Sequence, residues 1–232
     1  MGLTIAKGYL LARTPYRIFD EIITILTSNG ARIALLALGT RKLQSKNARN
    51  LFFGHLLEFS FFAARTSKKV SKLKSVHTLV AVPWTIERNI ALLNCNQLFM
   101  QMPILTKEFA EFYTWALALI KQQIKPWPTL LFIVQKLFAL YNFEFVTDQC
   151  VLCGKKTELV TYSLPAGGLI CHNCCSPAQR QSIDTKTTQA LFALFHSDLP
   201  TIVKIFNDRM CRKLIQMLLT TLNYHLGSHF HL

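Results

Sequence analysis

The chain has 232 residues, of which 51% are hydrophobic, and a formal net charge of +14. This length allows one large domain or two to three small ones, and the apolar content is enough for a sizeable core. Polar residues and prolines interrupt the apolar stretches, so no segment has the roughly 20 apolar residues of a membrane-spanning helix. Lys7, Arg13 and Arg17 precede any apolar run. We therefore expect no signal peptide, and disulfides are disfavoured.

The first eighty residues predict a small β-barrel. Runs rich in β-forming residues cover residues 5–12, 21–27, 32–38, 51–64 and 72–80. Asn29-Gly30 separates the second run from the third, which is a strong hairpin signal. Gly54 is expected to form a bulge or bend in the fourth run. Five strands in so short a segment indicate a five-stranded Greek-key barrel of the OB type.

Beyond residue 80 the apolar residues follow helical spacing. The expected helices cover residues 85–102, 106–124, 129–145, 185–196 and 208–226. Pro103 should end the first, and Pro126-Trp127-Pro128 should break the chain before Thr129 caps the third. The sequence thus predicts an α+β protein with an OB-like domain at residues 1–80 and a helical domain at residues 81–232. A cysteine-containing knuckle is expected at residues 148–177 within the helical domain.

Four cysteines have the spacing C-x2-C-x17-C-x2-C, namely Cys150, Cys153, Cys171 and Cys174. Two residues between cysteines let both sulfurs reach one metal ion, and two such pairs close a tetrahedral thiolate site. We expect these residues to bind Zn²⁺ in a structural role, because four thiolates leave no open coordination position. Two disulfides or a metal-free remnant are the alternatives. Cys175 is a fifth nearby thiol, so which sulfur is the fourth ligand stays open.

Positive charge is concentrated in the first eighty residues. This segment contains 13 of the 26 lysines and arginines but only three acidic residues, so its net charge is +10 against +4 for the remainder. Such an excess is typical of proteins that bind a polyanion. A solubilising surface and attraction to an anionic membrane are the alternatives.

The sequence offers little support for an enzyme. It has neither the G-x-x-x-x-G-K-[ST] nor the G-x-G-x-x-G phosphate-binding motif. Cys171 and His172 are adjacent, and neighbouring residues on a knuckle rarely point at one another as a nucleophile and a base. The 12 acidic residues provide few candidates for a paired-carboxylate site. We therefore expect no enzymatic activity.

Several motifs resemble the RecO family. Gly8-Tyr9-Leu10-Leu11 with Tyr16 and Asp20-Glu21 resembles the family's opening strand, its tyrosine-containing loop and the start of its second strand. Leu26-Thr27, Gly30 and Gly39-x-Arg41-x-x-x-Ser45 resemble its hairpin and its glycine, arginine and serine loop. Phe143, Cys150-x-x-Cys153-Gly154, Gly167-Gly168-x-x-Cys171-x-x-Cys174 and the stretch 222–227 resemble its knuckles and closing helix.

This resemblance implies a cytoplasmic, nucleoid-associated recombination mediator for DNA repair. The family binds single- and double-stranded DNA, anneals complementary strands, and works with RecR and single-strand-binding protein to load recombinase. A pocket with basic rims, including Lys121, Lys125 or Lys136, could receive the acidic tail of single-strand-binding protein. The alternative is a zinc-ribbon-containing RNA-binding or scaffold protein without annealing activity.

The barrel would then supply a basic track and an aromatic platform. The candidates for the track are Arg41, Lys42, Lys46, Arg49, Arg65, Lys68, Lys69, Lys72 and Lys74. Their contacts with phosphates would give affinity without sequence preference. Tyr9, Tyr16 and Phe52 are the candidates for stacking on bases, and packing in the core is the alternative for each.

Overall fold

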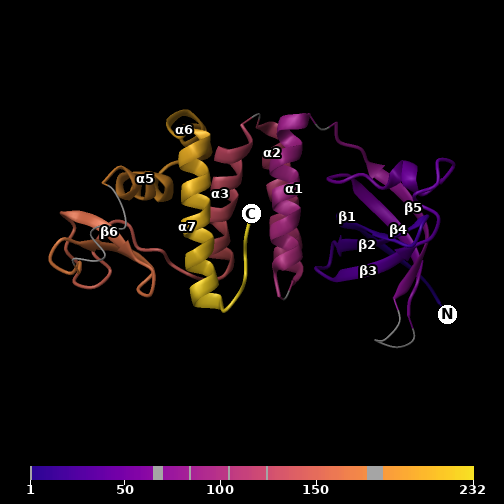
Figure 1. Cartoon of the computed structure of the whole chain (residues 1–232), viewed down its shortest axis with the longest axis horizontal. Coiled ribbons are helices and arrows are strands. Elements are labelled where there is room, and N and C mark those ends of the chain that lie inside the picture. Colours follow the sequence, from indigo (N-terminus) through magenta and orange to yellow (C-terminus); the bar gives the residue numbers. More distant parts are fainter. Residues whose placement is uncertain (1, 65–69, 84, 104, 124, 177–184) are drawn as a thin grey trace. The chain divides into compact units, whose positions relative to one another are not determined.

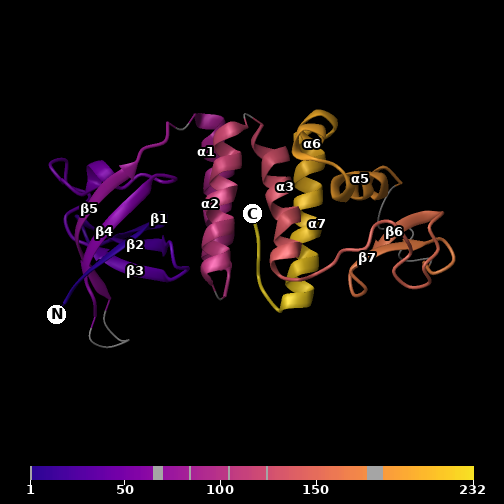
Figure 2. The same cartoon turned by 180° about the vertical axis from the view of Figure 1, so that it is seen from behind.

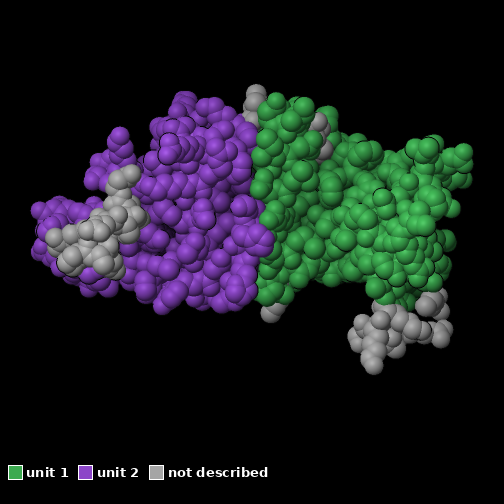
Figure 3. Space-filling view, in the orientation of Figure 1, with its two compact units in different colours: residues 1–124 green, residues 125–232 purple. Residues whose placement is uncertain are grey.

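The computed structural model describes residues 2–64, 70–83, 85–103, 105–123, 125–176 and 185–232 (Figure 1). The chain divides into two compact units, residues 1–124 and residues 125–232 (Figure 3). The division expected after residue 80 falls inside the first unit. That residues 1–80 form a domain by themselves stays a prediction.

Five strands form a closed barrel in the first unit, in the order β1-β2-β3-β5-β4. They are β1 (Leu3–Tyr16), β2 (Asp20–Thr27), β3 (Arg32–Ala37), β4 (Leu56–Phe62) and β5 (Ser71–Val80). β3 pairs with β5 in parallel, and the other neighbouring strands pair antiparallel. This is a five-stranded Greek-key barrel of the OB type. The predicted fold class is confirmed.

The barrel is filled by side chains from alternate strand positions. β2 illustrates this, because Glu21, Ile23 and Ile25 are buried and the residues between them are half-buried. The buried cluster consists of Leu10, Ile23, Ile25, Leu35, Ala37, Leu51, Leu57, Phe59, Phe61, Leu73 and Val76. Full burial of each large apolar side chain contributes about 1.5–3 kcal/mol, so this cluster can drive folding of the barrel.

Strand β1 pairs with two different strands along its length, and this closes the barrel. Its first half pairs with β4 and its second half with β2, and Gly8 is the residue that pairs with both strands. A Cβ atom at Gly8 would lie 2.1 Å from the carbonyl oxygen of Leu26. The crossing therefore requires glycine. A bulge between Leu10 and Ala12 then bends the strand towards β2.

The fourth strand is shorter than the predicted range 51–64. It begins at Leu56, after a short 3-10 helix, η1 (Ala48–Asn50), and an irregular segment. Leu51 is buried in the barrel core, and Gly54 has φ of +73°, so the chain turns there before entering the strand. The prediction of one long strand was wrong because Leu51 is buried in the core although it lies outside the strand.

Two helices complete the first unit, α1 (Ile86–Gln101) and α2 (Lys107–Gln122). The Thr85 hydroxyl accepts a hydrogen bond from the Arg88 backbone N–H and caps α1. The Arg32 guanidinium donates to the carbonyls of Phe99, Met100 and Met102 at the end of α1. A Cβ atom at Gly30 would lie 2.2 Å from the Thr106 backbone. The β2–β3 hairpin therefore packs tightly against the α1–α2 connection.

The second unit contains a helical part and a small hairpin. Its elements are α3 (Pro126–Leu140), β6 (Leu159–Ser163), β7 (Gly168–Cys171), α5 (Thr185–His196), α6 (Leu199–Ile205) and α7 (Asp208–Leu226). α3 packs along α7, and β6 pairs with β7 (Figures 1 and 2). No helix in the described ranges of either unit combines the length and the apolar character needed to cross a bilayer.

Helix α3 differs from its predicted range of 129–145. It begins at Pro126 and ends at Leu140, so the two prolines lie in its first turn. Proline fits there because the N–H groups of the first turn have no partner within the helix. After the helix, Asn142 has φ of +53°, which turns the chain away.

Candidate functional site

The four cysteines of the predicted metal site lie on two turns beside the β6–β7 hairpin. The first turn is closed by the backbone hydrogen bond from Gly154 to Cys150, and Gly154 has φ of +76°. The second turn begins at the end of β7, where the Cys174 N–H donates to the Cys171 carbonyl. Both turns thus present their sulfurs to the same region.

The sulfur positions fit a tetrahedral metal ion. The Sγ atoms of Cys150, Cys153, Cys171 and Cys174 all lie within 4.8 Å of one another. The Cys153 and Cys171 sulfurs are 3.7 Å apart. A zinc–sulfur distance of about 2.3 Å in a regular tetrahedron requires sulfurs about 3.8 Å apart. The Cys175 thiol instead donates to the Ser176 carbonyl, and Cys175 lies outside this group.

The first turn also favours a thiolate. Burial opposes ionisation of Cys150, but backbone N–H groups of Cys171, Leu152 and Cys153 donate to its sulfur and lower its pKa to about 6. Hydrogen bonds to the sulfurs of Cys153 and Cys171 raise the pKa of Cys174 to about 12. A bound cation would favour its thiolate instead, because a coordinated thiol loses its proton. The donor set therefore fits a soft divalent ion such as Zn²⁺.

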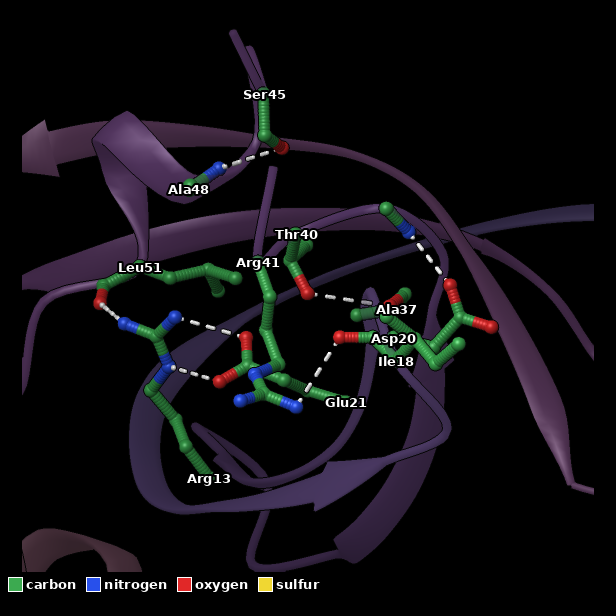
Figure 4. A network of polar contacts seen from close by, with 11 residues as sticks. Arg13, Ile18, Asp20, Glu21, Ala37, Thr40, Arg41, Ser45, Ala48 and Leu51 are labelled. Atoms are coloured by element: carbon green, nitrogen blue, oxygen red, sulfur yellow. Dashed lines mark hydrogen bonds and ion pairs between the residues drawn. The ribbon is translucent and has the colours of Figure 1, made fainter. Parts of the chain in front are cut away.

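In the barrel, the loop of residues 39–49, here the basic loop, is fixed at its start to the β1–β2 turn (Figure 4). The Gly39 N–H donates to the Asp20 carboxylate at 2.8 Å, and the Arg41 N–H donates to the Phe19 carbonyl at 3.0 Å. The Thr40 hydroxyl donates to the Ala37 carbonyl. These bonds hold the loop against the turn.

The end of the basic loop is fixed to strand β5. The Asn47 side chain donates to the Lys74 carbonyl and accepts from the Val76 N–H, both at 3.2 Å. Asn50, just beyond the loop, accepts from the Thr78 hydroxyl. The loop therefore runs from the β1–β2 turn to β5, and Asn47, the neighbour of Lys46, contacts the backbone of Lys74.

The structure describes six of the nine residues of the predicted basic track. All six are exposed: Arg41, Lys42, Lys46 and Arg49 on the loop and Lys72 and Lys74 on β5. The fixed loop joins these two sets. Arg65, Lys68 and Lys69 lie outside the described residues.

Arg41 has a further role that the sequence does not indicate. Its guanidinium donates to the carbonyl of Arg17 at 3.3 Å and to that of Ile18 at 3.2 Å. Figure 4 shows the bond to Ile18. Arg17 has φ of +54°, an unusual value that these bonds help to maintain. Arg41 thus supports the β1–β2 turn as well as contributing charge.

The adjacent acids Asp20 and Glu21 both have structural partners. Asp20 accepts from the basic loop, and Glu21 forms a two-point contact with Arg13, whose shortest N···O distance is 2.8 Å. Burial opposes ionisation of Glu21, but hydrogen bonds and the charge of Arg13 outweigh it and lower the pKa of Glu21 below 4.5. Arg13 also donates to the Leu51 carbonyl (Figure 4). This network ties β1 and β2 to the segment before β4.

The β1–β2 turn carries cation–aromatic pairs that sequence reasoning missed. Arg17 lies over the Tyr16 ring at 5.1 Å, and Lys42 lies over the Phe19 ring at 5.2 Å. An open depression of about 500 Å³, here the turn surface, is lined by Arg17, Ile18, Phe19, Asp20, Leu38, Gly39 and Lys42. The loop between the first two strands binds ligands in OB folds. The basic and aromatic residues of this loop could therefore have been predicted to take part in binding.

The predicted aromatic candidates occupy different environments. Tyr16 and Phe52 are exposed, by 38% and 52%. Tyr9 instead packs against Tyr113 of α2, with ring centres 5.2 Å apart, and it is half-buried. Tyr9 therefore contributes to packing, which was the alternative considered for each of these residues.

The three lysines considered for an acidic tail have different surroundings. Lys121 lines a pocket of about 180 Å³ in the first unit, with Tyr9, Leu56, Val80, Leu117 and Ala118 among its neighbours. Lys136 lines a pocket of about 600 Å³ in the second unit. The Lys125 ammonium donates to the Val203 carbonyl. Of the three, Lys121 is the one whose surroundings combine a lysine with mainly apolar walls, and its role in binding an acidic tail stays a prediction.

Together these features define a protein with an OB-type barrel, a helical part and a four-cysteine cluster able to hold a metal ion. Residues 1–80 match the family model described as Recombination protein O N terminal. Residues 107–232 match the model described as Recombination protein O C terminal. The chain therefore belongs to the RecO family of DNA repair proteins, and the resemblance inferred from its motifs is confirmed.

Curated relatives agree with this assignment. The chain is 24% identical to the DNA repair protein RecO of Syntrophomonas wolfei over 92% of its own length and 87% of the relative's. It is 24% identical to that of Mesoplasma florum over 75% of its length and 68% of the relative's. For the protein of Bacillus pumilus, the identity is 23% over 82% and 76%.

Proposed function

We propose that this RecO-family chain is a recombination mediator that binds single- and double-stranded DNA and anneals complementary strands without covalent catalysis. The observation that carries the proposal is the basic loop, which is fixed at both ends and exposes its cations next to those of β5. Fixed cations suit a polyanion because little conformational freedom is lost on binding. We place this activity in the cytoplasm, at the nucleoid.

Annealing requires two polyanions to approach each other. A cationic surface lowers their repulsion by neutralising phosphates, and it needs no nucleotide hydrolysis. If all six described cations contact single-stranded DNA, the logarithm of affinity should fall with that of salt concentration with a slope of about −4. Phe19 of the turn surface and the neighbouring Tyr16 would add stacking on bases, worth about 1–3 kcal/mol per base.

We further propose that the chain works with RecR and single-strand-binding protein to load recombinase. The pocket beside Lys121 is the candidate for the acidic tail of single-strand-binding protein. Its walls are mainly apolar and include one lysine, with no acid among its lining residues. Such a pocket can take an apolar end group while the lysine attracts the neighbouring carboxylates.

We propose Zn²⁺ as the ion of the cysteine cluster, with Cys150, Cys153, Cys171 and Cys174 as ligands. The ion would supply structural cross-linking only, since four thiolates leave no open position. The backbone donors around Cys150 stabilise its thiolate and orient the first turn.

The test is an annealing assay with complementary oligonucleotides and purified full-length protein. We expect faster pairing that needs no ATP and no added metal, leaves strand length unchanged and weakens steeply with salt. The control replaces Lys186, an exposed residue of α5 outside the barrel, with alanine. Failure to accelerate pairing at low salt would contradict the mediator proposal, and preferential binding of structured RNA would favour the RNA-binding alternative.

A further inference from the structure

We propose that the pocket between α3, residues 142–148 and the end of α5 binds an arginine side chain carried by an extended segment of a protein partner. This pocket, here the α3–α5 pocket, has a volume of about 600 Å³. It lies within the second unit, and its lining includes none of the barrel residues assigned to DNA. The proposal does not depend on DNA binding.

The first observation is an unsatisfied acceptor in the pocket wall. Gln135 is only 9% exposed and lines the pocket. Within the described residues, its Oε1 atom has no hydrogen-bond partner. A buried acceptor without a donor is costly and uncommon in folded proteins. A ligand that donates a hydrogen bond would remove this cost.

The second observation is unpaired negative charge at the rim. Glu144 and Asp148 are exposed and line the same pocket. Neither forms an ion pair among the residues that the structure describes. The rim therefore attracts a cation.

The pocket also contains basic side chains, but both have partners. The Lys136 ammonium lies 4.9 Å from the centre of the Phe132 ring. The His196 ring stacks on Phe192 at 4.2 Å, and its Nδ1 atom lies 2.9 Å from the Phe192 carbonyl oxygen. The Phe132 ring does not neutralise Lys136, so the lining carries two negative charges against one positive charge, a net charge of −1 with His196 neutral.

The floor of the pocket is aromatic. Phe138, Phe145 and Phe195 form one cluster, with ring centres 5.2–5.9 Å apart, and all three line the pocket. A guanidinium group stacks on aromatic faces and carries five N–H donors in one plane. It can therefore satisfy an amide oxygen and carboxylates while lying on phenyl rings.

The backbone indicates that the guanidinium belongs to a peptide. The Val146 N–H donates to Gly167, and the Val146 carbonyl accepts from Leu169. Adjacent residues of an extended chain direct these groups to opposite sides. Within the described ranges, no backbone hydrogen bond is found for Phe145 or Thr147, and both line the pocket. Phe145 and Thr147 are only 6% and 4% exposed, so a partner segment would reach their backbone groups by entering the pocket.

The test measures binding of a fluorescent, blocked heptapeptide of alternating valine and threonine with a central arginine. Its control replaces the arginine with citrulline, which keeps the shape but lacks the charge. We expect full-length protein to bind the arginine peptide at least about tenfold more tightly than the citrulline peptide at low salt. Equal binding of the two peptides would overturn the proposal.

Protein variants locate the site. Gln135→Leu and Asp148→Asn should each weaken binding of the arginine peptide by about tenfold. Asp208→Asn, which removes the same charge from the first turn of α7 outside the pocket, should leave binding unchanged. Unchanged binding by Gln135→Leu, or an equal loss in Asp208→Asn, would overturn the assignment to this pocket.

Two further measurements keep the test independent of folding and of ligand size. Gln135→Leu should keep or raise the thermal midpoint, because it removes an unsatisfied acceptor; a marked decrease would refute the argument from Gln135. Ethylguanidinium should bind far more weakly than the peptide. Equal affinity would overturn the peptide assignment in favour of a small-molecule site.

Discussion

The barrel and the cysteine hairpin are stabilised in different ways. The barrel encloses a cluster of large apolar side chains that includes Leu10, Phe59 and Phe61. The buried cluster of the hairpin consists of Ile170 and three cysteines. An apolar core of the first kind can drive folding, whereas one of the second kind is too small to do so without a cross-link. The comparison indicates that the barrel is independent of the metal and the hairpin is not.

Removal of two of the proposed metal ligands should have the largest effect. The variant with both Cys150→Ser and Cys153→Ser should lose its metal and the hydrogen-exchange protection of β6 and β7, because binding of structural zinc supplies much of the folding free energy of such sites. The barrel should keep its protection and its binding to DNA. Cys175→Ser is the control and should retain the metal. Loss of protection in the barrel strands would show that the two regions are not separable.

A methyl group at the strand crossing should disrupt the barrel itself. Gly8→Ala places a Cβ atom 2.1 Å from the Leu26 carbonyl oxygen, so we expect a loss of about 3 kcal/mol or more in the free energy of unfolding. Urea unfolding of the full chain measures this. Gly2→Ala meets no atom within 4 Å and should be neutral. A neutral Gly8→Ala would mean that β1 does not cross between its partners as described.

The ion pair of Glu21 with Arg13 should make barrel stability depend on pH. Because the pKa of folded Glu21 lies below its ordinary value of 4.5, its contribution is complete above pH 4.5 and is lost as the pH falls through the folded pKa. Glu21→Gln should cost about 2 kcal/mol at neutral pH, since Arg13 then loses its ionised partner.

Thermal unfolding of the wild type and Glu21→Gln between pH 6 and pH 3 checks this dependence. The two stability curves should converge at the acidic end. Glu111→Gln is the control, because Glu111 forms only an exposed pair with Lys107. Parallel curves would contradict a lowered pKa for Glu21.

The smallest effects are expected at the surface of the basic loop. Lys42→Ala and Lys46→Ala should each reduce the salt slope of single-stranded DNA binding by about 0.7, with little change in stability. Arg41→Ala should reduce the slope and also lower the thermal midpoint, because two carbonyls of the β1–β2 turn lose their donor. Titrations at several salt concentrations, paired with thermal unfolding, separate the two outcomes. An unchanged slope in all three variants would place the DNA surface elsewhere.

The features that could be predicted from the sequence are those set by neighbouring residues. Runs rich in β-forming residues indicated the strands, and apolar residues at helical spacing indicated α1. The predicted start of α3 was wrong because the prolines at 126 and 128 were taken to break the helix. Proline is tolerated in the first turn of a helix, and that is where both lie. The short helix α6 was missed because a helix of 7 residues has too few turns to show periodicity.

The sequence by itself determined the class of fold, the set of clustered cysteines and the location of the charge, because each depends on composition or short spacing. Only the tertiary structure decided that Tyr9 packs against Tyr113, that Arg41 supports a turn and that Gln135 lies buried without a donor. Asn47 likewise reaches Lys74 across 27 positions of the chain. Such contacts depend on how distant segments meet, and no local pattern of residues encodes that meeting.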